Sequence, residues 1–255
     1  MAHDPLADFT TETFSFGGKP RTVYRQGTGP AVIVMAEVPG ITPRVADFAR
    51  TLVEHGFSVF MPHLFGRPGE GPSAASMART IVPACVSKEF RAFALGTTPP
   101  AIDWLRALAR DAHERCGGPG VGAVGMCFTG GFALAMATEP SLLAPVLSQP
   151  SLPIGPRGAA AVGCSDADLL TVKERDDLCV LGLRFSGDKL SPGARFATLR
   201  RELGDRFIGV ELPTPADRPR AHSVLTEDLV HGPDEPTWQA LQQVLAFLSE
   251  RLHTV

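Results

Sequence analysis

The chain has 255 residues, of which 44% are hydrophobic and 20% are charged, and its formal net charge is −3 at pH 7. This composition is typical of a globular protein with a large core, and we expect one domain over residues 1–255. The small negative charge gives no general attraction to nucleic acid or to anionic membranes, so we expect a small-molecule partner.

The cysteines and the N-terminus narrow the class of protein further. The 5 cysteines are scattered, with no Cys-x-x-Cys pair and no Cys/His ligand spacing, which argues against a disulfide scaffold and against a zinc site. The first residues are too polar for a signal peptide, and no apolar run approaches the roughly 18 residues that a membrane span needs. We therefore expect a cytoplasmic protein without a metal; the sequence leaves both a monomer and a homodimer open.

Apolar runs alternate with amphipathic stretches, which predicts an α/β fold with a mostly parallel sheet and helices on both faces. Strands are expected at 13–16 and 22–25 (an antiparallel hairpin), 31–36, 57–62, 121–124, 142–147, 179–185 and 207–212. Helices are expected at 43–55, 99–115, 128–138, 165–175, 192–203 and 235–252. A Gly/Pro-rich loop at 64–72 leads to a less regular segment at 73–96, a candidate pocket rim or lid.

Residues 122–131 read Gly-Ala-Val-Gly-Met-Cys-Phe-Thr-Gly-Gly and place Cys127 where a buried strand turns sharply into a helix. A side chain at such a turn projects above the sheet, and the amides of a helix N-terminus favour the thiolate. Gly125 and Gly130 stand where a tight turn excludes larger side chains. Cys127 is thus a candidate nucleophile; the alternative is a small buried hydrophobe.

The same stretch contains the dinucleotide-binding pattern Gly-x-Gly-x-x-Gly at Gly120, Gly122 and Gly125. That loop has to follow a strand, whereas the residues before Gly120 are polar and turn-forming. We expect the strand to run through the glycines, which argues against nucleotide binding.

Two later residues supply partners for the thiol in the order acid, then histidine. Asp188 follows the strand at 179–185, and His222 follows the last strand. Both are expected at the edge of the sheet where Cys127 lies. Asp188 has the alternative role of a turn residue beside Gly187, and His63, which also ends a strand, competes with His222 as the base.

Glu37 is an acid at the end of an apolar strand, where it either caps the following turn or hydrogen-bonds the resting thiol and shuttles a proton. The backbone N–H groups of Val38 and Phe128 are the candidate oxyanion hole.

These residues together resemble the dienelactone hydrolase family of the α/β-hydrolase superfamily. The resemblance rests on the Val32–Gly40 segment, the Gly125-x-Cys127 elbow, the Gly187-Asp188 loop and the late Ala221-His222. It implies that Cys127 is the nucleophile, that Asp188 and His222 are its partners, and that Glu37 interacts with the resting thiol. It also implies hydrolysis of a lactone or ester through an acyl-enzyme, with no metal or organic cofactor.

The chain departs from the family pattern at two places. Thr129 replaces the usual glycine two residues after the nucleophile, so either the elbow differs or the hydroxyl faces the pocket as a substrate-binding group. The family arginine that follows the histidine and binds the substrate carboxylate is missing. Arg91 and Arg220 are candidate replacements, with solvated surface roles as the alternative.

The leading hypothesis is a cysteine-dependent hydrolase of small esters or lactones. A thiol redox or sensor protein is the alternative from another class, with Cys164 or Cys179 as resolving partner of Cys127. A promiscuous esterase/phosphotriesterase on the same site and a non-catalytic ligand-binding relative are further alternatives.

Overall fold

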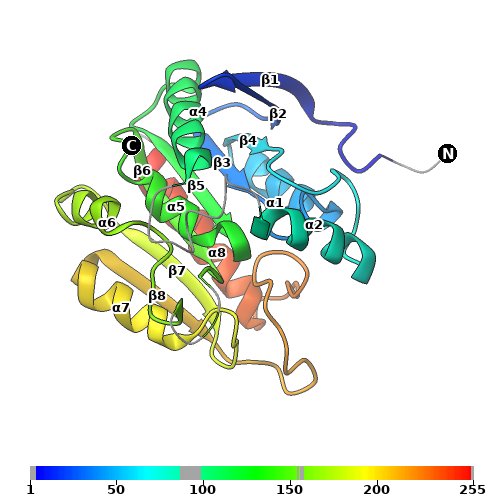
Figure 1. Cartoon of the computed structure of the whole chain (residues 1–255), viewed down its shortest axis with the longest axis vertical. Coiled ribbons are helices and arrows are strands. Elements are labelled where there is room, and N and C mark those ends of the chain that lie inside the picture. Colours follow the sequence, from blue (N-terminus) through cyan, green and yellow to red (C-terminus); the bar gives the residue numbers. More distant parts are fainter. Residues whose placement is uncertain (1–3, 87–98, 154, 156–157, 254–255) are drawn as a thin grey trace.

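The computed structural model describes residues 4–86, 99–153, 155 and 158–253. In this part of the chain, a single 8-stranded sheet has the order β1-β2-β4-β3-β5-β6-β7-β8 (Figure 1). The strands are β1 Thr10–Phe16, β2 Lys19–Gln26, β3 Ala31–Met35, β4 Ser58–Pro62, β5 Val121–Met126, β6 Leu142–Ser148, β7 Val180–Phe185 and β8 Phe207–Leu212. β1/β2 and β2/β4 pair antiparallel, and the remaining pairs are parallel. This mostly parallel sheet confirms the predicted α/β-hydrolase fold.

The helices are α1 Pro43–Glu54, α2 Ala74–Val86, α4 Pro100–Cys116, α5 Gly130–Met136, α6 Asp166–Lys173, α7 Gly193–Leu203 and α8 Pro236–Leu252. Six of them lie where the sequence predicts a helix. α2 is the exception, because it occupies part of the segment predicted to be irregular. The rest of that segment, residues 87–96, lies outside the described residues, so the candidate pocket rim or lid is described only in part.

Alternate residues of the central strands feed two cores. Ile33 and Met35 of β3 belong to the core that also contains residues of α4, α5 and α7 on one face, while Val32 and Val34 belong to the core that contains residues of α1 and α8 on the other. Strands buried on both faces need continuous apolar runs, which is why β3 and β4 are prominent in the sequence. β5 runs through Gly122 and Gly125, which confirms the predicted strand. A dinucleotide-binding loop would have to follow a strand, so these glycines do not form one.

The parallel strands end at one edge of the sheet, and the loops that follow β3, β5, β6, β7 and β8 gather there. Among the described residues, no helix combines the length and apolarity needed to cross a membrane.

Candidate active site

Cys127 lies at a strained turn between β5 and α5. Its φ is 51°, an unusual value for a residue with a side chain, and a single 3₁₀ turn over Cys127–Thr129 leads into α5. A Cβ on Gly125 would lie 2.2 Å from the carbonyl oxygen of Thr129, and one on Gly130 would lie 2.5 Å from Cα of Pro150. The glycines therefore permit the close approach of β5, α5 and the loop after β6 that the predicted turn requires. The side chain of Cys127 is half-buried at this turn.

Thr129 belongs to the elbow and not to the pocket. Its side chain is fully buried; the hydroxyl accepts a hydrogen bond from the amide of Met126 at 2.9 Å and donates to the carbonyl of Met35 at 2.8 Å. These contacts join β5 to β3 directly below Cys127. They correct the expectation that the hydroxyl faces substrate, and they explain how threonine replaces glycine there.

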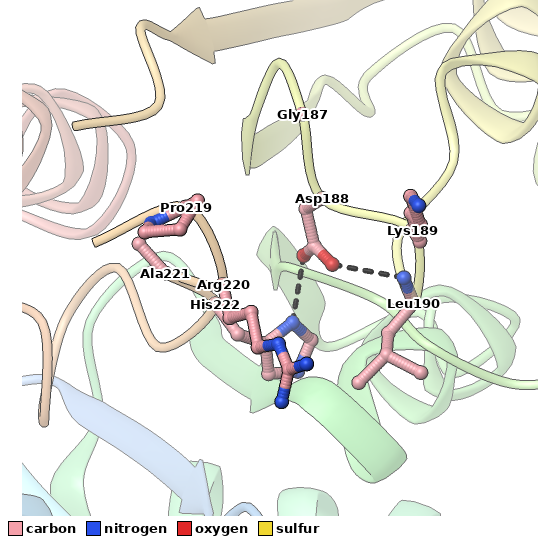
Figure 2. A pocket seen from close by; sticks show the side chains of 8 residues that line it. All are labelled: Gly187, Asp188, Lys189, Leu190, Pro219, Arg220, Ala221 and His222. Carbon is pink, nitrogen blue, oxygen red and sulfur yellow. Dashed lines mark hydrogen bonds and ion pairs between the residues drawn. The ribbon is translucent and has the colours of Figure 1, made fainter. Parts of the chain in front are cut away.

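Asp188 and His222 come together from the loops that follow β7 and β8. Asp188 Oδ2 lies 2.6 Å from Nδ1 of His222, and Oδ1 accepts the amide of Leu190 at 2.9 Å (Figure 2). Asp188 is only 8% exposed, so its carboxylate is committed to these contacts. The competing His63 is directed elsewhere: its Nε2 lies 3.1 Å from the carbonyl oxygen of Gly66.

The ring of His222 is mostly buried. Burial opposes its protonation, but the hydrogen bond that Nδ1–H donates to Asp188 and the interaction of the ring with Cys127 together raise the pKa of His222 to about 10. Nε2 is buried and has no well-aligned hydrogen-bond partner among the described residues. An imidazolium next to a thiol is the arrangement that favours a thiolate–imidazolium pair.

Glu37 lies directly after β3 and is fully enclosed. Its carboxylate accepts hydrogen bonds from Ser223 at 2.6 Å, from Gln149 at 3.2 Å and from the hydroxyl of Thr226. Burial raises the pKa of Glu37, although both hydroxyl donors oppose that shift. Within the described residues none of its partners is Cys127, so the expected contact with the resting thiol is replaced by contacts with the loop that carries His222.

The hydrogen-bond partner of the thiol is Ser151, which the sequence analysis missed. Sγ of Cys127 lies 3.2 Å from Oγ of Ser151, and the amide of Ser151 donates to the carbonyl of Cys127 at 3.0 Å. No local sequence pattern predicts this contact, because Ser151 follows β6 whereas Cys127 follows β5. The only signals in the Ser151 loop are its prolines and glycines.

Three further residues that the sequence analysis missed hold these loops in place. Asp228 accepts the amides of His222 at 2.7 Å and Ser223 at 3.0 Å. Arg184 donates to carbonyl groups of Ser186 at 2.9 Å and Ser191 at 2.7 Å, on either side of Asp188. Arg195 on α7 donates to the carbonyl groups of Pro150 and Pro153, on either side of Ser151.

The two proposed oxyanion donors lie at the same edge of the sheet. Met35 of β3 is in register with Gly125 of β5, so Val38, three residues later, and Phe128 both follow the carboxyl ends of neighbouring strands. Their backbone N–H groups stay a prediction.

A pocket of about 450 Å³ opens beside the Asp188–His222 pair. Its lining residues, drawn in Figure 2, are Gly187, Asp188, Lys189, Leu190, Pro219, Arg220, Ala221 and His222. Arg220 is thus at the pocket, whereas Arg91 lies outside the described residues. In the described part of the chain, no cluster of three or more His, Cys, Asp or Glu side chains has the arrangement of a metal site.

Solved structures with the same architecture place the chain in a class. A dienelactone hydrolase-like promiscuous phosphotriesterase from metagenomic libraries is 17% identical with a TM-score of 0.64, covering 96% of this chain and 98% of its own. A dienelactone hydrolase from Anabaena variabilis ATCC 29413 is 17% identical with a TM-score of 0.60, covering 96% and 98%. A thioesterase domain from the curacin biosynthetic pathway is 12% identical with a TM-score of 0.59, covering 93% and 99%. Such identities establish the fold alone, and the chain is an α/β-hydrolase in that sense.

The family follows from the sequence. The model of the dienelactone hydrolase family matches residues 18–154, more than half of the chain. This chain belongs to the dienelactone hydrolase family and is a hydrolase. The matched stretch contains Glu37 and Cys127 and ends before Asp188 and His222. No curated protein sequence matches the chain.

Proposed function

We propose that this hydrolase cleaves small esters or lactones through an acyl-enzyme on Cys127, with His222 as its acid–base partner and Asp188 orienting the imidazole. The observation that carries the proposal is the 2.6 Å bond between Asp188 and His222 Nδ1, formed beside a cysteine held at positive φ. This is the nucleophile–base–acid logic of α/β-hydrolases with sulfur in place of oxygen.

The first half of the reaction forms a thioester. The Cys127 thiolate attacks the carbonyl carbon, and the amides of Val38 and Phe128 stabilise the oxyanion. When the tetrahedral intermediate collapses, the carbon–oxygen bond breaks and the imidazolium of His222 gives its proton to the leaving oxygen. For a lactone, the released alcohol stays attached to the acyl group.

The second half restores the enzyme. Neutral His222 takes a proton from water, the resulting hydroxide adds to the thioester carbonyl, and the carbon–sulfur bond breaks to release a carboxylic acid. Cys127 leaves as the thiolate beside the protonated imidazole. Asp188 holds the Nδ1–H tautomer throughout, so that Nε2 performs both proton transfers.

Replacing Cys127 tests the proposal. We expect Cys127→Ala to lose at least about 1,000-fold in kcat/KM on p-nitrophenyl acetate, because the step that needs a nucleophile disappears. Cys179→Ala is the matched control, since Cys179 precedes β7 at the opposite edge of the sheet. Mass spectrometry of the Cys127 peptide after rapid acid quench should reveal the acyl adduct. Alanine at 127 with more than a tenth of the wild-type activity would refute the assignment.

The substrate panel should include lactones, aryl esters and phosphate triesters. The triesters are included because one structural relative is a promiscuous phosphotriesterase and because an oxyanion hole also accepts a phosphoryl centre. Esters with and without a carboxylate should be compared in Arg220→Ala, since Arg220 lines the pocket beside His222.

The redox alternative gains no support from the described cysteines. Cys116, Cys127, Cys164 and Cys179 are free, and burial raises the pKa of Cys164 far above its ordinary value, which disfavours it as a resolving thiolate.

A further inference from the structure

The sulfur of Cys127 and the hydroxyl of Ser151 form a contact that the triad does not require. They are 3.2 Å apart, a short separation for a hydrogen bond to sulfur. Ser151 is 4% exposed, so water has little access to its side chain. Among the described residues, Ser151 is the hydrogen-bond partner of this sulfur at good geometry, and the imidazole of His222 is the titratable group that interacts with it.

The position of Ser151 is fixed from both sides. Its amide bonds to the carbonyl of Cys127, and the preceding Pro150 packs so closely on α5 that Gly130 has no room for a side chain. The guanidinium of Arg195 is completely buried and donates to the carbonyl of Pro150, to that of Pro153 at 2.8 Å and to that of Gly158 at 3.0 Å. The Ser151 hydroxyl is therefore already ordered at its distance from the sulfur before substrate binds, so no side-chain entropy of Ser151 is lost on binding.

Glu37 does not compete for this role. Its carboxylate is occupied by Ser223, Thr226 and Gln149. A neutral hydroxyl beside the sulfur has a different effect from a carboxylate: it stabilises a thiolate as a hydrogen-bond donor, whereas an ionised carboxylate repels one.

We propose that Ser151 donates its O–H to the Cys127 thiolate in the resting enzyme, so that it stabilises the nucleophilic form and fixes the direction of the sulfur. The proton stays on Oγ, and no bond to sulfur forms or breaks. When the thiolate attacks substrate, its charge passes to the oxyanion and the hydrogen bond weakens. Ser151 therefore helps to set the pH range in which Cys127 is present as the reactive thiolate. The proposal rests on the role of Cys127 given above.

The test is the pH dependence of Cys127 alkylation by iodoacetamide in wild type, Ser151→Ala and Ser151→Thr. We expect Ser151→Ala to move the midpoint upward by about one pH unit, which makes alkylation about tenfold slower below the midpoint and leaves the plateau rate at high pH nearly unchanged. Ser151→Thr, which keeps the hydroxyl, should return the midpoint toward that of wild type.

Ser58→Ala is the matched control, because Ser58 is 1% exposed and lies at the amino end of β4, whereas Cys127 follows the carboxyl end of β5. Its midpoint should equal that of wild type. An unchanged or lowered midpoint in folded Ser151→Ala overturns the proposal, since it means that the hydroxyl does not donate to a thiolate.

A measurement on the unmodified site covers the case in which Ser151→Ala fails to fold. The difference Raman spectrum of wild type minus Cys127→Ala at neutral pH should lack an S–H stretching band, because Cys127 is then a thiolate. An S–H band shifted by hydrogen bonding would mean that the thiol donates to Ser151, which overturns the proposal. Alkylation and Raman need no turnover. If Cys127→Ala keeps its esterase activity, the proposed function fails while these data still decide the role of Ser151.

Discussion

Glu37 shows how burial changes the role of a single residue. An isolated carboxylate in the core is costly unless donors surround it, and this one collects two hydroxyl groups and an amide. Two of these donors, Ser223 and Thr226, belong to the loop of His222. At the residue scale, Glu37 therefore joins the end of β3 to the loop that carries His222, and it influences the position of that proposed base.

This arrangement predicts a pH-dependent stability. The folded-state pKa of Glu37 is raised above its ordinary 4.5 by burial, so its contribution is fully present below about pH 4.5 and is lost as pH rises through the elevated value. In Glu37→Gln that loss cannot occur. We expect the free energy of unfolding of wild type, relative to Glu37→Gln, to decrease between pH 4.5 and neutrality in urea titrations. A constant difference across this range would mean that Glu37 is unperturbed.

At the scale of elements, two buried arginines on neighbouring elements hold the loops that carry Asp188 and Ser151. Arg184 on β7 binds the Asp188 loop, and Arg195 on α7 binds the Ser151 loop. Burial lowers the pKa of Arg195 to about 10, yet it finds carbonyl partners in place of a carboxylate. Neither role could be predicted from the sequence, because the partners are backbone atoms of segments up to 45 residues away.

Removing the Arg195 clamp should be costly. Arg195→Met leaves several buried carbonyl groups without donors, and we expect a loss of about 3 kcal/mol or more in the free energy of unfolding. Arg200→Met on the same helix is the control; Arg200 is exposed and pairs with Glu211, so about 1 kcal/mol or less is expected. Equal stability of the two variants in urea denaturation would mean that the hydrogen bonds of Arg195 to the buried carbonyl groups do not stabilise the fold.

At the scale of the whole molecule, the sequence predicts the sheet well because buried parallel strands require continuous apolar runs. It also predicts the pairing of Asp188 with His222, since their order after successive strands places both at one edge. It does not predict which side chains fill the space between loops. Thr129, Ser151 and Asp228 act through contacts across that space, and residues of these types occur in most loops.

The separation between scaffold and site predicts a class of mutations that affect stability alone. Leu248 of α8 is fully buried and packs against Gly122, at the start of β5 and far from Cys127. We expect Leu248→Ala to lose about 3–5 kcal/mol of unfolding free energy through the cavity it creates, with kcat/KM per folded molecule unchanged. Gln243→Ala, on the exposed side of the same helix, should change stability by less than about 0.5 kcal/mol. A large fall in kcat/KM of folded Leu248→Ala would show coupling between the two edges.

The hydroxyl of Thr129 has a dynamic consequence as well. By accepting the amide of Met126 inside the core, it should make that amide one of the slowest in the chain to exchange with deuterium, opening only when the whole fold opens. The segment 213–235 that carries His222 consists of turns and bends, and its amides should exchange through local opening. Cys127 would thus belong to the most stable cooperative unit and His222 to a less stable one, so that mild heating would separate the two side chains before the sheet unfolds.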